Sequence, residues 1–214
     1  MKAARRHGGF TLIEIAIALT VISLVLGGIL IAGNVLIERS RVASLLSKIK
    51  DLGTASRDFK SRYGYFPGDL PNAATYIAGV SSGCTYDATV VGVGNGLVDT
   101  ATESTCALEH LVRAGLLSKI EQDQAGNYLI SSGFSSSVGM GQVSLWFDGA
   151  TNQNVIRVTA LPCNIALEID RKLDNDSPTP FSQGSVLGTD AKGNLIQTCT
   201  VGGTNDPLTL LVGY

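Results

Sequence analysis

The feature that most constrains the fold is an apolar run near the N-terminus. The 23 residues from Ile15 to Ile37 contain no Asp, Glu, Lys or Arg. As an α-helix rising ~1.5 Å per residue, this run is long enough for the ~30 Å hydrocarbon layer of a membrane. Lys2, Arg5 and Arg6 precede it, which predicts a cytoplasmic N-terminus. We therefore expect one membrane-spanning helix over about residues 13–37, with the C-terminal bulk of the chain outside the cytoplasm.

The overall composition excludes several classes of protein. The chain has 214 residues, which suits one principal domain, and its charged fraction of 16% is too low for charge-driven disorder. Its mean hydropathy is +0.23, its formal net charge is −2 and its pI is near 5.6. Because a chain with this net charge offers no excess of positive charge to bind the phosphates of DNA or RNA, no nucleic-acid partner is expected.

The start of the apolar run carries a short motif with a carboxylate in it. The stretch from Gly9 to Glu14 reads G-F-T-L-I-E and follows a short basic leader. This motif resembles the type IV prepilin signature of type IV pilins and type II secretion pseudopilins. The resemblance implies that a prepilin peptidase cleaves between Gly9 and Phe10, removes residues 1–9 and methylates the new amine of Phe10.

Glu14 needs a partner, because an unpaired carboxylate at the centre of a bilayer costs ~2.5–3.5 kcal/mol. Cleavage creates a cationic amine at Phe10, and we expect Glu14 to pair with that amine in a neighbouring subunit when the helices bundle. The alternative is that Glu14 snorkels to the membrane surface. Thr11 beside it is expected either to donate a further hydrogen bond or to cap the helix.

The pattern after the apolar run predicts an amphipathic continuation of the same helix. Apolar residues from Ile37 to Phe59 recur mostly every three or four positions, with charges between them. We expect one helix over residues 10–62 and a globular head over residues 63–214. Four short β-branched and aromatic segments predict an antiparallel sheet in the head, and hence an α+β fold. They are Tyr128–Ile130, Gln142–Phe147, Val155–Ala160 and Leu195–Cys199.

Three stretches of the head extend the resemblance to pilin-like proteins. Tyr63 to Ala73 is similar to Y-G-x-x-P-G-D-x-P-N-A, and Glu103 to Leu117 is similar to a helix with E-x-x-x-A-x-x-H-L-x-x-A-G-L. Ile169 to Pro178 is similar to I-D-x-K-x-D-D-G-x-P. The glycine-rich tract Val90 to Leu97 is expected to be a loop; it lacks the lysine and the Ser/Thr ending of a phosphate-binding loop.

The four cysteines all follow the apolar run, in the part expected to meet oxidising conditions. No C-x-x-C spacing is present, which argues against zinc and for disulfides. Of three possible pairings we favour Cys84 with Cys106 and Cys163 with Cys199, because each closes one local excursion of the chain.

The remaining candidate sites are weak. Asp170, Asp174 and Asp176 form an oxygen-rich cluster that predicts either a calcium loop or a solvated turn, and no other cofactor is expected. His110 has no nucleophile placed beside it, so we interpret it as a packing or capping residue and expect no enzyme. Trp146, between Leu145 and Phe147, is expected in the core of the sheet.

These observations predict a structural subunit that assembles by helix bundling into a type II secretion pseudopilus or a type IV pilus. Its expected location is the bacterial inner membrane, as a single-pass protein with a periplasmic head, and then a periplasmic or extracellular filament. The resemblance implies three partners: other pilin-like subunits, the prepilin peptidase and the inner-membrane assembly platform. The alternative is a minor pilin whose head binds DNA, a surface or a secreted substrate at the filament tip.

Overall fold

A single long helix, α1 (Leu12–Tyr63), accounts for 52 residues of the chain. The structure is a computed structural model that describes residues 11–87, 89–90, 92–118, 120–174, 181, 184–190, 192–203 and 206–214. Gly64 ends the helix with a φ of 81°, and its N–H donates to the carbonyl of Lys60 at 2.8 Å. Glycine adopts this left-handed conformation without strain. The long N-terminal helix expected from the sequence is thus present, over Leu12–Tyr63.

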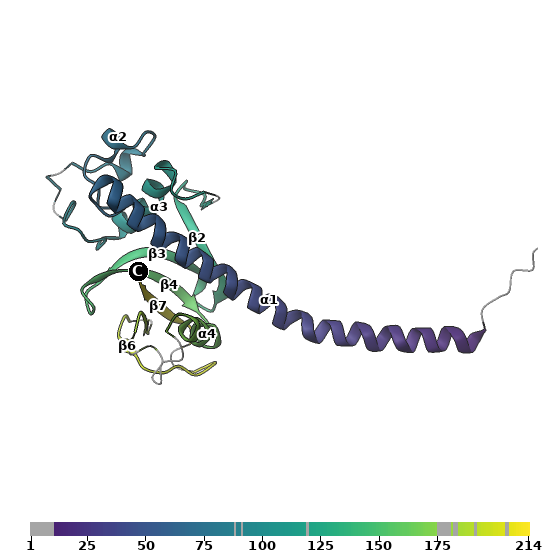
Figure 1. Cartoon of the computed structure of the whole chain (residues 1–214). Helices are drawn as coiled ribbons and strands as arrows, with labels where there is room; N and C mark the ends of the chain where they lie inside the picture. The colour runs from purple at the N-terminus through teal and green to yellow at the C-terminus, as the bar shows by residue number, and fades with distance from the viewer. Residues whose placement is uncertain are drawn as a thin grey trace, which may run out of the picture. The chain divides into compact units, whose positions relative to one another are not determined.

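The chain divides into two units, residues 1–41 and 42–214. In the second unit, the later part of α1 lies along one face of the sheet (Figure 1). A Cβ on Gly53 would come within 3.1 Å of the Tyr214 Cβ, and Ser56 Oγ lies 3.0 Å from Tyr214 Oη. The residues that this part of α1 buries recur at helical spacing: Val42, Leu45, Ile49, Leu52, Ala55 and Phe59.

Among the described residues, seven strands form one antiparallel sheet in the order β1-β2-β3-β4-β7-β5-β6. The strands are β1 (Glu121–Gln122), β2 (Tyr128–Ser136), β3 (Gly139–Asp148), β4 (Gln153–Leu161), β5 (Val186–Thr189), β6 (Leu195–Ile196) and β7 (Leu208–Gly213). Alternate residues of the central strands point towards α1 and are buried, including Leu145, Ile156 and Leu210. This alternation is what a sheet with one covered face requires.

Four shorter elements complete the head: α2 (Ala73–Tyr76), the 3-10 turn η1 (Ser82–Cys84), α3 (Ala101–Arg113) and α4 (Cys163–Asp174). Thr100 begins α3 with a capping box: its side chain accepts from Glu103 N, and the Glu103 side chain accepts from Thr100 N. Two orphan amides of the first turn are satisfied in this way. The whole is an α+β, pilin-like architecture, so the expected fold class is confirmed.

Several elements differ from the sequence prediction. The segment Leu195–Cys199 forms a strand only over Leu195–Ile196. Three strands, β1, β5 and β7, were not predicted, although β7 lies inside the sheet between β4 and β5. The acidic stretch, expected to be a calcium loop or a solvated turn, is helical as far as Asp174. It forms the end of α4, which buries Ile165, Ala166 and Ile169.

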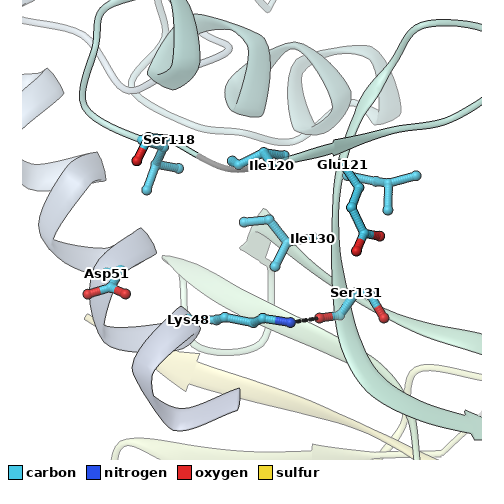
Figure 2. A pocket seen from close by; sticks show the side chains of 9 residues that line it. Lys48, Asp51, Ser118, Ile120, Glu121, Ile130 and Ser131 are labelled. Atoms are coloured by element: carbon cyan, nitrogen blue, oxygen red, sulfur yellow. Dashed lines mark hydrogen bonds between the residues drawn. The ribbon is translucent and has the colours of Figure 1, made fainter. Parts of the chain in front are cut away.

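A small cavity of about 120 Å³ lies between α1 and strand β2 (Figure 2). Lys48 crosses it from α1 and donates from Nζ to the carbonyl of Ser131 at 2.7 Å. The cavity is well below the ~300 Å³ of typical ligand pockets. We interpret the hydrogen bond from Lys48 to Ser131 as a structural contact that holds α1 against β2.

Candidate functional site

The first candidate site is the start of α1, where the prepilin-like motif ends. Thr11 Oγ1 accepts a hydrogen bond from Glu14 N at 3.3 Å, and the Thr11 carbonyl accepts from the amides of Glu14 and Ile15. Thr11 therefore caps the helix, one of the two roles expected for it. Gly9 and Phe10 lie outside the described residues.

Glu14 lies in the first turn of α1 and is exposed to solvent. An acidic group in this position interacts favourably with the partial positive charge of the helix N-terminus. Within residues 11–87 and the other described ranges, the Glu14 carboxylate has no hydrogen-bond or ion-pair partner. It is thus available to a group from another molecule.

The first part of α1 exposes its apolar side chains on all sides. Leu12 is 93% exposed and Leu24 is 78% exposed. More than half of the surface of each of Ile13, Ile17 and Leu19 is also exposed. No helix in the described part of the chain combines the length and the mean hydropathy that crossing a membrane requires.

In the head, Asp69 of the Tyr63–Ala73 motif fastens the glycine-rich loop. Its buried carboxylate accepts from the amides of Gly94, Asn95 and Gly96, at 3.2 Å for Asn95 and 2.8 Å for Gly96. Burial raises the pKa of this carboxyl, while the three amides act in the opposite direction. The described residues of this tract, 90 and 92–97, therefore form a loop, as expected, and the conformation of residues 94–96 depends on one acid from a distant motif.

His110 joins the first two head motifs. Its Nδ1 accepts from Gly68 N at 3.0 Å, and its Nε2 lies 2.9 Å from the carbonyl of Cys84, so Nε2 carries the proton. The imidazole is buried and stacks on Phe59 of α1 with the ring centroids 6.0 Å apart. Burial lowers its pKa, which favours this neutral tautomer. Both nitrogens are engaged in structural contacts, in keeping with a packing residue.

Gly68 allows the Tyr63–Ala73 motif to pack closely against the Glu103–Leu117 motif. Its φ is +92°, and a Cβ at this position would lie 2.2 Å from the carbonyl oxygen of Glu103. Glycine is therefore required for the loop to approach α3 closely enough for His110 to bind its amide. Neighbouring Glu109 accepts from the amide and the hydroxyl of Ser81 at 2.7 and 2.8 Å.

Two disulfides, Cys84–Cys106 and Cys163–Cys199, account for all four cysteines. The first joins η1 to α3 across a sequence separation of 22, and the second joins the start of α4 to the loop after β6 across a separation of 36. This is the pairing that the local-excursion argument favours.

The acidic cluster contributes to the structure around the end of α4. Asp174 accepts from the amides of Ser185 and Val186 at 3.0 and 2.9 Å, and buried Asp170 accepts from Phe181 N at 3.4 Å. Burial raises the pKa of Asp170. Asp176 lies outside the described residues. In the remaining described chain, no three His, Cys, Asp or Glu side chains are grouped to hold a metal ion.

The prediction for Trp146 is wrong. Its side chain is only half-buried and projects from the sheet face opposite to that of buried Leu145. The Arg157 guanidinium lies over the indole ring, 4.1 Å from the ring centroid. Sequence reasoning gave Arg157 no role, although strict alternation along β3 would have placed Trp146 on the face away from Val143 and Leu145.

Comparison with known proteins gives one match. Residues 4–30 match the prokaryotic N-terminal methylation motif. No curated protein and no solved structure matches the chain. The matched motif is the prepilin-type signature of the type IV pilin and pseudopilin family, so the resemblance expected from Gly9 to Glu14 is confirmed.

Proposed function

Because the chain carries this signature, we propose that it is a structural subunit of a type II secretion pseudopilus or a type IV pilus. The methylation motif over residues 4–30 is the observation that carries the proposal. A prepilin peptidase cleaves the precursor between Gly9 and Phe10 and methylates the amine of Phe10. The first half of the helix, about residues 13–37, anchors the precursor in the inner membrane, and the run from Ile15 to Ile37 without charged residues supports this role.

Assembly proceeds by bundling of the N-terminal helices with those of other subunits at the inner-membrane platform. In the bundle, the carboxylate of Glu14 pairs with the amine of Phe10 from a neighbouring subunit. The exposure of Glu14 and its lack of a partner in the described chain support this step. The apolar side chains around it are covered by lipid before assembly and by other helices afterwards.

The head, residues 63–214, lies in the periplasm or on the extracellular filament. Its two disulfides support this location, because disulfides persist in oxidising compartments. The engagement of His110 by Gly68 and Cys84 supports a structural role rather than catalysis. A binding role of the head at the filament tip is the second candidate, favoured by the groove beside Trp146 described below.

Intact-mass spectrometry of the protein from cells with and without the prepilin peptidase tests the processing step. With the peptidase, we expect loss of residues 1–9 and gain of one methyl group on Phe10. Without it, the full precursor mass is expected. A mature protein that begins near Gly33, or a mass without the methyl group, contradicts the proposal. A cell-surface shear fraction then separates a pilus, which is released, from a periplasmic pseudopilus, which is not.

A further inference from the structure

The face of the sheet away from α1 carries a group of polar side chains around the only tryptophan of the sequence. Gln142, Ser144 and Trp146 alternate along β3 and project from the same face. Arg157 of β4 pairs in register with Ser144. The indole ring holds the guanidinium over its face by a cation–π contact at 4.1 Å. The position of Arg157 is therefore fixed before any ligand arrives.

Arg157 lacks an anionic partner. Across the described ranges its side chain forms no hydrogen bond or ion pair, and its Nε atom is buried. Burial lowers the pKa of the guanidinium, yet an arginine stays charged at neutral pH. A partly buried charge without a partner has lost hydration without regaining hydrogen bonds. An anion in contact with Arg157 would restore them.

A groove of about 290 Å³ leads to this arginine. It is lined by residues of α3, including Thr105, of the turn before β2, including Asn127, and of strands β2, β3 and β4. This volume is just below the range of small-molecule pockets, ~300–1,000 Å³, so it admits a group of about one ring.

The neighbouring polar groups define what such a ligand needs. Asp123 also borders the groove, but its carboxylate accepts from the amides of Ala125 and Asn127 at 2.9 and 2.8 Å and from the Asn127 side chain at 3.0 Å. It is therefore not the missing partner of Arg157. The side chains of Gln142 and Ser144 make no hydrogen bond within the described structure, so an amide and a hydroxyl remain free beside the guanidinium.

We propose that this groove binds a carboxylate-bearing sugar residue, a uronate, through Arg157, Ser144 and Gln142. The planar fork of the guanidinium matches a carboxylate bidentately. The free amide and hydroxyl both donate and accept, as the ring hydroxyls of a sugar do. An acidic peptide side chain offers the carboxylate but no ring hydroxyls, and each backbone group of a peptide either donates or accepts. The proposal goes beyond filament assembly and does not rest on the pairing of Glu14.

The test uses the full chain in detergent and titrates it with glucuronate. Trp146 reports binding directly, because the sequence has no other tryptophan, and calorimetry provides an independent readout. We expect a saturable change with glucuronate and at least tenfold weaker binding of uncharged glucose. Arg157→Gln is expected to weaken glucuronate binding at least tenfold, and Arg157→Lys by a smaller factor, because lysine keeps the charge but loses the fork. Arg41→Gln, which removes an exposed charge from α1, is the matched control and should bind as the wild type does.

Three results would overturn the proposal. The first is no saturable signal with glucuronate in either readout. The second is unchanged binding by an Arg157→Gln protein whose melting and disulfides are native. The third is tighter binding of a short glutamate-containing peptide than of glucuronate, which would assign the groove to a protein partner. If the arginine variants do not fold, Ser144→Ala tests the same groove, and we expect it to weaken glucuronate binding several-fold.

Discussion

The two halves of α1 solve the problem of burying apolar side chains in different ways. Leu52, in the later half, is fully buried, whereas Leu24, in the first half, is 78% exposed. Both halves are continuous helix, but only the later half has charges on one side and apolar residues on the other. The later half is stabilised by its own chain, because the sheet covers its apolar face. The described apolar side chains of the first half stay exposed, as the proposed contacts with lipid and other subunits require.

The largest expected effect is on assembly and concerns the first half only. Glu14→Ala should abolish filament formation, because the Phe10 amine of the adjoining subunit would be buried as an unpaired cation. Insertion of the monomer should become easier by part of the ~2.5–3.5 kcal/mol that an intramembrane carboxylate costs. Membrane-fraction abundance, leader removal and cross-linked filament are measured in one strain.

Asp58→Ala is the matched control, since Asp58 is an exposed acid on the later half of the same helix. It should leave assembly intact. If Glu14→Ala assembles as well as this control, Glu14 is a snorkelling residue and the pairing mechanism is wrong.

The next largest expected effect is on the stability of the head. It compares the same substitution, leucine to alanine, in the later and the first half of α1. Leu52→Ala should lower the free energy of unfolding by about 2–5 kcal/mol, because it leaves a cavity between α1 and the sheet. Leu24→Ala should change it by less than ~0.5 kcal/mol. Denaturant unfolding followed by Trp146 fluorescence measures both variants. Equal losses would show that the first half also packs on the head.

Removal of the disulfides should destabilise the head and leave the first half of α1 unchanged. The closed loops span separations of 22 and 36, which correspond to about 3 and 4 kcal/mol in the chain-entropy account. Double alanine variants of each pair are compared by denaturant unfolding. A larger loss for Cys84 with Cys106 would indicate that this bond also orders the contact between His110 and the Cys84 carbonyl.

The same comparison shows what the sequence could predict. The helix from Leu12 to Tyr63 was readable because a charge-free run and a three-to-four periodicity are both long signals. The cysteine pairing followed from loop lengths. The position of Trp146 was not read correctly, because a tryptophan among apolar residues looks buried unless the pleat of β3 is counted from Val143.

Elements that depend on distant partners were harder to predict. Strand β7, with the sequence L-T-L-L-V-G, is a short apolar run at the chain end, and only its pairing with β4 and β5 makes it a strand. The helical spacing of Ile165 and Ile169 was present in the sequence, but the acids near Asp174 were interpreted as a loop. The roles of Asp69 and Gly68 arise from motifs more than twenty residues away, so no local pattern reveals them.

The smallest expected effect is a pH dependence that belongs to the head alone. His110 has a lowered pKa in the folded state because it is buried, whereas an unfolded histidine titrates near pH ~6.5. Between these two values the unfolded chain binds more protons than the folded chain, so stability is lost as the pH falls below ~6.5. The expected slope is at most ~1.4 kcal/mol per pH unit. Denaturant unfolding at several pH values between 5 and 8 measures it.

His110→Gln isolates this contribution, because glutamine retains one acceptor and one donor group and does not titrate. Asp69 and Asp170 act in the opposite direction, because burial raises their pKa values in the folded state. Their contribution to stability is fully present below the unfolded pKa of ~4 and is lost as the pH rises through the raised folded pKa. Both carboxyls are present in the wild type and in the variant, so their contribution cancels in the difference between the two curves. That difference should be flat above pH ~6.5 and slope downwards below it. A flat difference over the whole range would mean that His110 accepts a proton in the folded head, and its contacts with Gly68 and Cys84 would then not fix the neutral tautomer.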